Sequence, residues 1–188
     1  MKKISTIFER DWDGNKAVLP MFKKGIDSLF LSNFCVPTEK IDGMNIRLTI
    51  RNRMVVRVEK RLNPTKLQKA KGIEDPWYTD AGEFQPEDKH IFAAVNGRKY
   101  DDVPDGEWSG EAIGPNIQGN PLNLERPTVY LFSIPKECVL LKDAPSTFDE
   151  LKAWLQTRKS GFGNGLIEGV VWHGPDGAMY KIKRKDFK

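Results

Sequence analysis

The sequence predicts an α+β fold, in which antiparallel strand pairs are combined with a few helices. One stretch of the chain alternates between apolar and polar residues with the period of a strand and is followed, after a short turn, by another such stretch, and two further stretches near the C-terminus are separated by the turn Gly174-Pro175-Asp176-Gly177. This pattern is typical of β-hairpins. The strands of the two predicted hairpins are expected at residues 45–50 and 54–59, and at residues 166–173 and 178–184. A third observation is a helix signal between them, which begins at Thr147.

The first 36 residues carry weaker signals. A short strand is predicted to begin near Ile4, a turn is expected at residues 11–15, and the apolar stretch 17–22 is interrupted by Pro20. A helix-like spacing of apolar residues follows in the segment that precedes the first hairpin. Its members are Ile26, Leu29, Phe30 and Phe34.

The middle of the chain alternates between polar loops and apolar strands. Residues 63–89 are rich in proline and glycine, which predicts a loop with one short helix. A helix over residues 86–95 is expected to end at Asn96-Gly97. Further strands are predicted at residues 106–114, 128–134 and 138–141, with a structured loop at 115–121.

The later helix and the glycines of the middle strand have distinct signatures. Thr147-Phe148-Asp149-Glu150 has a capping-box pattern, and a stripe at helical spacing follows it. The glycine-rich segment 161–165 is expected to end this helix. Glycines inside the strand at 106–114 indicate close approach of a ligand or of another backbone.

Length and composition predict one domain that spans residues 1–188. The chain is 39% hydrophobic, which allows a sizeable core, and its net charge of +4 with a pI near 9.0 is compatible with a polyanionic partner. The N-terminus lacks the apolar core of a signal peptide, and no apolar run reaches membrane-spanning length. We therefore expect a cytoplasmic protein without membrane association.

The few cysteines and histidines have no spacing typical of a metal site. Cys35 and Cys138 are far apart in the sequence, as are His90 and His173. A zinc centre or a disulfide framework is therefore not expected. A single bridge between the two cysteines stays open as an alternative.

The stretch Glu39-Lys40-Ile41-Asp42-Gly43-Met44-Asn45 comes directly before the first predicted hairpin. Gly43 allows a tight turn or close approach to a ligand, so the side chain of Lys40 is expected to project from a short loop that feeds a well-anchored strand. Lysine is a nucleophile only when it is neutral, and nearby cations or burial favour the neutral amine. Lys181 and Lys183, which share one strand face by their spacing, are the candidates for such cations.

Six segments, in order, resemble the motifs of the covalent nucleotidyltransferase superfamily, and most closely those of phage-type, nick-sealing ATP-dependent RNA ligases. The first is the Lys40 stretch. The others are Lys60-Arg61, Gly110-Glu111 with its downstream Ile-Gln-Gly-Asn run, Val129-Tyr130-Leu131-Phe132, Ile167-Glu168-Gly169, and Lys181-Ile182-Lys183. The resemblance covers residues 38–187 and implies a nucleotidyltransferase (ATP-grasp-like) domain, with antiparallel sheets flanking a nucleotide pocket.

This resemblance implies roles for individual residues. Lys40 would become adenylylated, Lys181 and Lys183 would reach the phosphates, and Glu168 would act on a metal ion or on phosphates. The expected cofactors are ATP and Mg²⁺ or Mn²⁺. The expected nucleotide-binding residues are Glu39, Lys40, Asn45, Arg61, Glu111, Phe132, Glu168, Lys181 and Lys183.

The sequence departs from the family pattern in three places. Ser133 stands where the family usually has an acidic residue, which leaves any contact there in doubt. Glu107 competes with Glu111 for the Gly-Glu position, and we prefer Glu111 for its distance to the downstream run. The sequence given stops after the last motif, so we expect a minimal form without the C-terminal accessory domain of the larger relatives.

The predicted function is that of an RNA ligase that joins 3′-hydroxyl and 5′-phosphate RNA ends, or seals a nicked duplex, through a lysyl-adenylate. Two alternatives stay open. One is another enzyme of the superfamily, either a DNA ligase or a GTP-using capping enzyme. The other is a non-catalytic subunit that binds nucleic acid and has a protein partner in place of the accessory domain.

Overall fold

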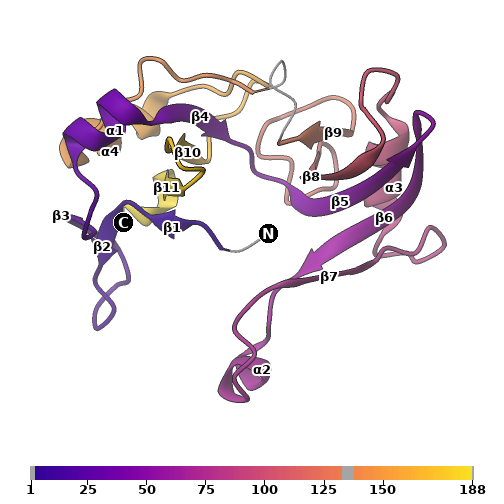
Figure 1. The fold of residues 1–188 in the computed structure, drawn as a ribbon, viewed down its shortest axis with the longest axis horizontal. Helices are drawn as coiled ribbons and strands as arrows, with labels where there is room; N and C mark the ends of the chain where they lie inside the picture. The colour runs from indigo at the N-terminus through magenta and orange to yellow at the C-terminus, as the bar shows by residue number, and fades with distance from the viewer. Residues whose placement is uncertain (1–2, 133–137, 188) are drawn as a thin grey trace. The chain divides into compact units, whose positions relative to one another are not determined.

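The computed structural model describes residues 3–132 and 138–187, which form two compact units. The described residues of the first unit fall mainly within Asp42–Cys138, and those of the second within Ile4–Ile41 and Val139–Lys188. Both units combine helices with sheets whose strands pair antiparallel, except for the parallel pair of β1 and β11, so the α+β prediction is confirmed (Figure 1). That the whole chain forms one domain stays a prediction.

The first unit is built on a five-stranded antiparallel sheet. Because β5 alternates strictly, Ile46, Leu48 and Ile50 are all fully buried on one face of this sheet. They form a core with helix α3 (Lys89–Asn96), which contributes Ile91 among others. In order across the sheet, the strands are β7 (Trp77–Asp80), β6 (Met54–Leu62), β5 (Met44–Arg51), β8 (Gly106–Ile113) and β9 (Thr128–Leu131).

The first predicted hairpin is confirmed as β5 and β6. Its two turn residues, Asn52 and Arg53, both have positive φ, which fits the right-handed twist of the flanking strands. The predicted short helix in the following loop is α2 (Lys66–Ala70), which lies at the far end of the connection from β6 to β7 (Figure 1). Strand β7 itself was not predicted, because prolines and glycines surround it.

The second unit contains a four-stranded sheet, a two-stranded sheet and two helices. Helices α1 (Ser28–Phe34) and α4 (Phe148–Thr157) supply Leu31, Leu151 and Leu155 to a core that also includes buried residues of the four-stranded sheet. That sheet has the order β1 (Ser5–Thr6), β11 (Met179–Lys183), β10 (Gly169–His173) and β4 (Val36–Lys40), and the smaller sheet pairs β2 (Phe8–Arg10) with β3 (Val18–Phe22). A short 3-10 helix, η2 (Arg184–Asp186), follows β11.

Several details of the sequence prediction need correction. The strand predicted at residues 138–141 is only an isolated bridge at Leu140. The capping box at α4 does not form, because the hydroxyl of Thr147 donates to the carboxylate of Glu150 rather than accepting from the helix backbone. The strand predicted at 128–134 is described only to Leu131, and Ser133 lies outside the described residues.

The close approach predicted from the glycines of β8 is confirmed at Gly110, where a Cβ would lie 2.2 Å from the backbone oxygen of Tyr130.

Both cysteines are free, so the bridge between Cys35 and Cys138 does not form. No helix within residues 3–132 and 138–187 combines the length and the apolarity needed to cross a membrane.

Candidate active site

Lys40 is the last residue of β4 and does not lie in a loop as predicted, because Val36–Lys40 pairs with β10. Its position is set by the register of the second unit's sheet. Gly169 of β10 pairs with Lys40 on one side and with Lys183 of β11 on the other. Residues paired across adjacent strands present their side chains on the same face. The two lysines therefore flank a position that carries no side chain.

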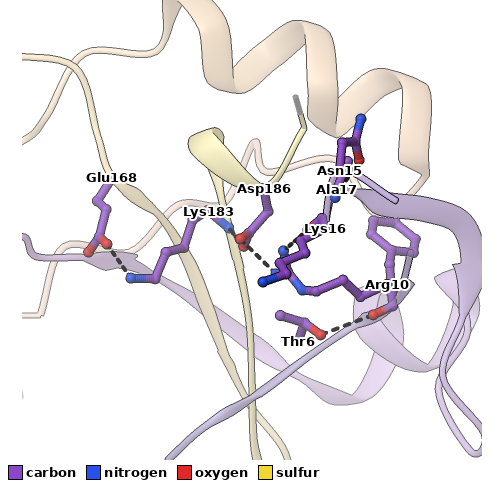
Figure 2. Close-up of polar contacts among 9 residues, drawn as sticks. Thr6, Arg10, Asn15, Lys16, Ala17, Glu168, Lys183 and Asp186 are labelled. Carbon is purple, nitrogen blue, oxygen red and sulfur yellow. Dashed lines mark hydrogen bonds and ion pairs between the residues drawn. The ribbon is translucent and has the colours of Figure 1, made fainter. Parts of the chain in front are cut away.

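Glu168 joins these two lysines. The Nζ of Lys40 donates to its Oε2, and the Nζ of Lys183 donates to its Oε1, each at 2.5 Å. The contact between Glu168 and Lys183 is visible in Figure 2. The Glu168 side chain is 7% exposed, whereas both lysine side chains are about one-fifth exposed, at 19% and 21%. The cluster is thus a buried carboxylate shared by two partly accessible ammonium groups.

The charge of Glu168 is set by two opposing effects. Burial alone would raise the pKa of its carboxyl group, but the ammonium groups of Lys40 and Lys183 outweigh burial and hold the pKa below its ordinary value. Glu168 is therefore ionised at neutral pH. The ionised carboxylate therefore accepts hydrogen bonds from Lys40 and Lys183 at the same time.

Lys181 lies two residues before Lys183 on the same face of β11. It pairs with Val171 of β10 and with Thr6 of β1. The predicted alternation of the two lysines with the buried Ile182 is therefore confirmed. All three predicted lysines belong to the same sheet of the second unit.

Glu39 precedes Lys40 and so points to the opposite face of β4. It is 3% exposed, and its carboxylate accepts hydrogen bonds from the Oγ of Ser160 at 2.5 Å and from the backbone N–H of Gly161 at 2.8 Å. Burial raises the pKa of Glu39, although these two hydrogen bonds act in the other direction. Its side chain thus fastens the glycine-rich loop after α4.

Thr38 and His173 form a further pair on the Lys40 face of the sheet. The Oγ1 of Thr38 lies 2.9 Å from the Nε2 of His173, and its hydroxyl also donates to the backbone oxygen of Val171 at 3.3 Å. Burial lowers the pKa of His173. No local pattern singles out this pair, which depends on the register between β4 and β10.

The first unit contains another group of the predicted site residues. Asn45 of β5 pairs with Glu111 of β8, and its Nδ2 donates to the backbone oxygen of Gly110 at 3.2 Å and to Oε1 of Glu111 at 3.4 Å. Glu111 is 8% exposed, whereas the side chain of its competitor Glu107 is 54% exposed. The predicted preference for Glu111 therefore falls on the more buried carboxylate.

Tyr78 is the residue of this group that sequence reasoning missed. Its hydroxyl donates to Oδ1 of Asn45 at 2.8 Å, and the guanidinium of Arg47 lies 4.6 Å from its ring centroid. Arg47 also forms a two-pronged contact with the buried Glu59, at 2.7 and 2.8 Å. The one available signal was the Trp77-Tyr78 pair within an otherwise polar stretch.

The remaining predicted residues of the first unit lie on the same sheet or next to it. Arg61 pairs with Tyr78 between β6 and β7, and its Nε is buried without a hydrogen-bond acceptor. Phe132 follows β9 and packs edge-to-face against Tyr130, with ring centroids 5.8 Å apart. Arg61 and Tyr78 are therefore close to Asn45 in the sheet.

The metal ligand that the family resemblance predicts is a single carboxylate, that of Glu168. Among the described residues no group of three or more His, Cys, Asp or Glu side chains could hold a metal ion. Magnesium is commonly bound by one or two carboxylates together with phosphates of the substrate. Glu168, whose two oxygens now face ammonium groups, fits that pattern.

Comparison with known proteins finds sequence similarity over residues 98–188. Residues 98–188 match the family model described as RNA ligase 1. Over 81 residues, the chain is 35% identical to RNA ligase 1 of Pongo abelii and 32% identical to that of Danio rerio. Each match covers 42% of this chain and 23% of the relative.

A solved structure of a Naegleria gruberi RNA ligase, the apo form of a lysine-to-alanine mutant, is also similar. It has a TM-score of 0.49 and 17% sequence identity, and the match covers 98% of this chain and 62% of that chain. The sequence matches support the resemblance to RNA ligases of the nucleotidyltransferase superfamily. The matched range includes Glu111, Phe132, Glu168, Lys181 and Lys183, whereas Glu39, Lys40, Asn45 and Arg61 lie before it.

Proposed function

We propose that this chain, whose residues 98–188 are similar in sequence to RNA ligase 1, acts as an ATP-dependent RNA ligase with Lys40 as its nucleophile. The observation that carries the proposal is the contact of Lys40 and Lys183 with the one buried carboxylate of Glu168. The family match covers Glu168 and Lys183, and the register of the sheet brings Lys40 to them.

In the first step, the neutral amine of Lys40 attacks the α-phosphorus of ATP. A nitrogen–phosphorus bond forms, the bond from the α-phosphorus to its bridging oxygen breaks, and pyrophosphate leaves. Because the Nζ of Lys40 donates to Glu168, this contact must open and a proton must pass from the amine to water before the nitrogen can attack. Lys183 stabilises the phosphate oxygens.

The later steps transfer the adenylyl group to RNA. The 5′-phosphate of an RNA end attacks the lysyl-adenylate, which releases Lys40 and gives an adenylylated end. A neighbouring 3′-hydroxyl then attacks the 5′-phosphate and expels AMP. The proposed substrates are therefore RNA ends with a 3′-hydroxyl and a 5′-phosphate.

Glu168 is the residue that would hold a magnesium or manganese ion together with the phosphates of ATP. When bound, such an ion neutralises charge on the phosphates. Glu168 would hold such an ion, and Lys40 would have to leave this carboxylate in order to attack.

The nucleotide and nucleic-acid preferences separate this proposal from the alternatives. We expect covalent labelling by α-labelled ATP and not by α-labelled GTP, and sealing of nicked RNA in preference to nicked DNA. Labelling by GTP would favour a capping-type enzyme, and preferential sealing of DNA would favour a DNA ligase. RNA binding without any labelling or sealing would contradict the proposal and would favour a non-catalytic subunit with a protein partner.

A further inference from the structure

The turn that follows Lys183 is fastened by a buried carboxylate that the proposed chemistry does not use. Asp186, the last residue of η2, is 8% exposed. Its Oδ2 accepts the backbone N–H of Lys183 at 3.0 Å, and its Oδ1 accepts Nη2 of Arg10 at 2.7 Å. Figure 2 shows both contacts, with Asp186 between Lys183 and Arg10. The carboxylate therefore connects the end of β11 to strand β2.

Arg10 is itself held in place. It is the last residue of β2, its side chain is 17% exposed, and its guanidinium also donates to the backbone oxygen of Lys16. On the far side of the turn, Phe187 packs against Phe8 and Phe148, with ring centroids 6.3 and 5.1 Å apart. The turn is thus fixed by one ion pair and by aromatic packing.

The same turn also holds Glu168, the ion-pair partner of Lys183. The backbone N–H of Arg184 donates to the backbone oxygen of Glu168 at 2.8 Å. Lys183 is held at both ends, because its backbone N–H donates to Asp186 and its Nζ donates to Glu168. A shift of this turn would move Lys183 and Glu168 relative to each other.

We propose that Asp186, held by Arg10, is a positioning residue that sets where the ammonium of Lys183 lies. This inference rests on the proposed function for its catalytic consequence, but the placement of Lys183 can be tested without any ligase activity. Asparagine at position 186 would keep the shape of the side chain. It would, however, present an N–H group to one of the two donors that now share the carboxylate.

The direct test measures the accessibility of Lys183. Folded protein is treated with limiting acetic anhydride, and peptide mass spectrometry gives the acetylation of Lys183 relative to Lys152, which is exposed on α4. In Asp186→Asn we expect this ratio to rise about threefold or more, as is typical when coupled neighbours are separated. Asp143→Asn, which removes a half-exposed partner of Arg158 in the same unit, is the matched control and should leave the ratio unchanged.

A second pair of variants covers the case in which Asp186→Asn fails to fold by circular dichroism. Arg10→Leu should raise the Lys183 ratio, and Arg10→Lys should restore it, because an ammonium can still donate to Asp186. An unchanged ratio in folded Asp186→Asn, or in Arg10→Leu when the first variant does not fold, would overturn the proposal.

The catalytic consequence is read separately. At saturating ATP, the single-turnover rate of Lys40 labelling should fall about tenfold in Asp186→Asn, since small misplacements of a catalytic group have effects of this size or larger. It should stay at the wild-type value in Asp143→Asn. If wild-type protein takes up no label, the proposed function fails, whereas the acetylation ratio still decides the role of Asp186.

Discussion

Glu168 is the residue that defines the electrostatics of the candidate site. Its carboxylate is nearly buried, and each of its oxygens accepts an ammonium N–H at 2.5 Å. A buried charge is tolerated only when it is paired with an opposite charge. Removal of the Glu168 charge would leave the two lysine ammonium groups uncompensated. Lys40 and Lys183 would then face each other without a counter-charge.

Glu168→Gln is therefore expected to lower the free energy of unfolding by about 2 kcal/mol at pH 7, a value reduced from that of a fully buried pair because both lysines are partly exposed. The pKa of Glu168 is lowered in the folded state, so its stabilising effect is complete above its ordinary pKa of 4.5 and is lost as the pH falls through the folded value. Urea unfolding at a series of pH values should show that the difference in stability between Glu168→Gln and wild type shrinks as the pH falls below 4.5.

Glu107→Gln is the control for this measurement, because its side chain is 54% exposed. Glu107→Gln should change the free energy of unfolding by less than about 0.5 kcal/mol at every pH of the series. A Glu168→Gln difference that stays constant from pH 7 into acid would contradict the ion-pair assignment.

His173 gives a pH dependence of a different origin. Burial lowers the pKa of His173 in the folded state, so below its ordinary pKa of 6.5 the unfolded chain binds a proton first and the protein loses stability. His173→Gln should remove this part of the dependence. Urea unfolding at about pH 7.5 and pH 5.5 should therefore show wild type losing more stability than the variant, and parallel losses would rule out the effect.

For individual residues, the sequence predicted the charged side chains of the site well and their hydrogen-bond partners poorly. Spacing placed Lys181 and Lys183 on one strand face, and the structure confirms it. The contact of Lys40 with Glu168 was not predicted, since it joins residues 128 positions apart that only the tertiary fold brings together. Tyr78 and Asp186 were missed because their significance comes from tertiary hydrogen bonds that no local pattern encodes.

Among the elements, the hairpin of β10 and β11 carries the site through its register. Gly169 lies between Lys40 and Lys183, and a Cβ at this position would lie 2.0 Å from the backbone oxygen of Ile182. A backbone atom cannot move aside as a flexible side chain can. The strand pair must therefore separate locally to admit any side chain here.

Gly169→Ala is expected to destabilise the protein by about 1–3 kcal/mol, the usual cost of overpacking, and to reduce labelling of Lys40. Gly174→Ala in the turn of the same hairpin is a matched control. Its Cβ would meet no atom closer than 3.4 Å, so stability should be almost unchanged. Thermal unfolding of both variants is the measurement, and equal melting temperatures would contradict the close approach at Gly169.

Elements with a strict period were predictable from the sequence, and elements fixed by long-range pairing were not. The hairpin of β5 and β6 and helix α3 were predicted because their apolar residues recur at strand and helix spacing. Strand β7 was missed because its four residues lie among prolines and glycines and pair only with β6. The segment at 138–141 is apolar enough for a strand but finds only a single bridge partner.

For the whole molecule, the net charge of +4 and the pI near 9.0 bear on RNA binding. Each phosphate contact by a cation releases counterions, so affinity falls as salt rises. We expect binding of a 5′-phosphorylated RNA to weaken about tenfold or more between roughly 50 and 200 mM KCl. Fluorescence anisotropy at several salt concentrations measures this, and affinity independent of salt would contradict an electrostatic interface.

The proposed ligase chemistry requires Lys40 to form a covalent bond to AMP. Wild-type protein is incubated with ATP and magnesium, and tandem mass spectrometry then locates any added AMP in the digested chain, with Lys40→Ala treated in parallel. We predict one AMP per chain on the Lys40 side chain of wild type and none on the variant. AMP on another residue of wild type, or an equal amount of AMP on the Lys40→Ala protein, would contradict the assignment of Lys40 as the nucleophile.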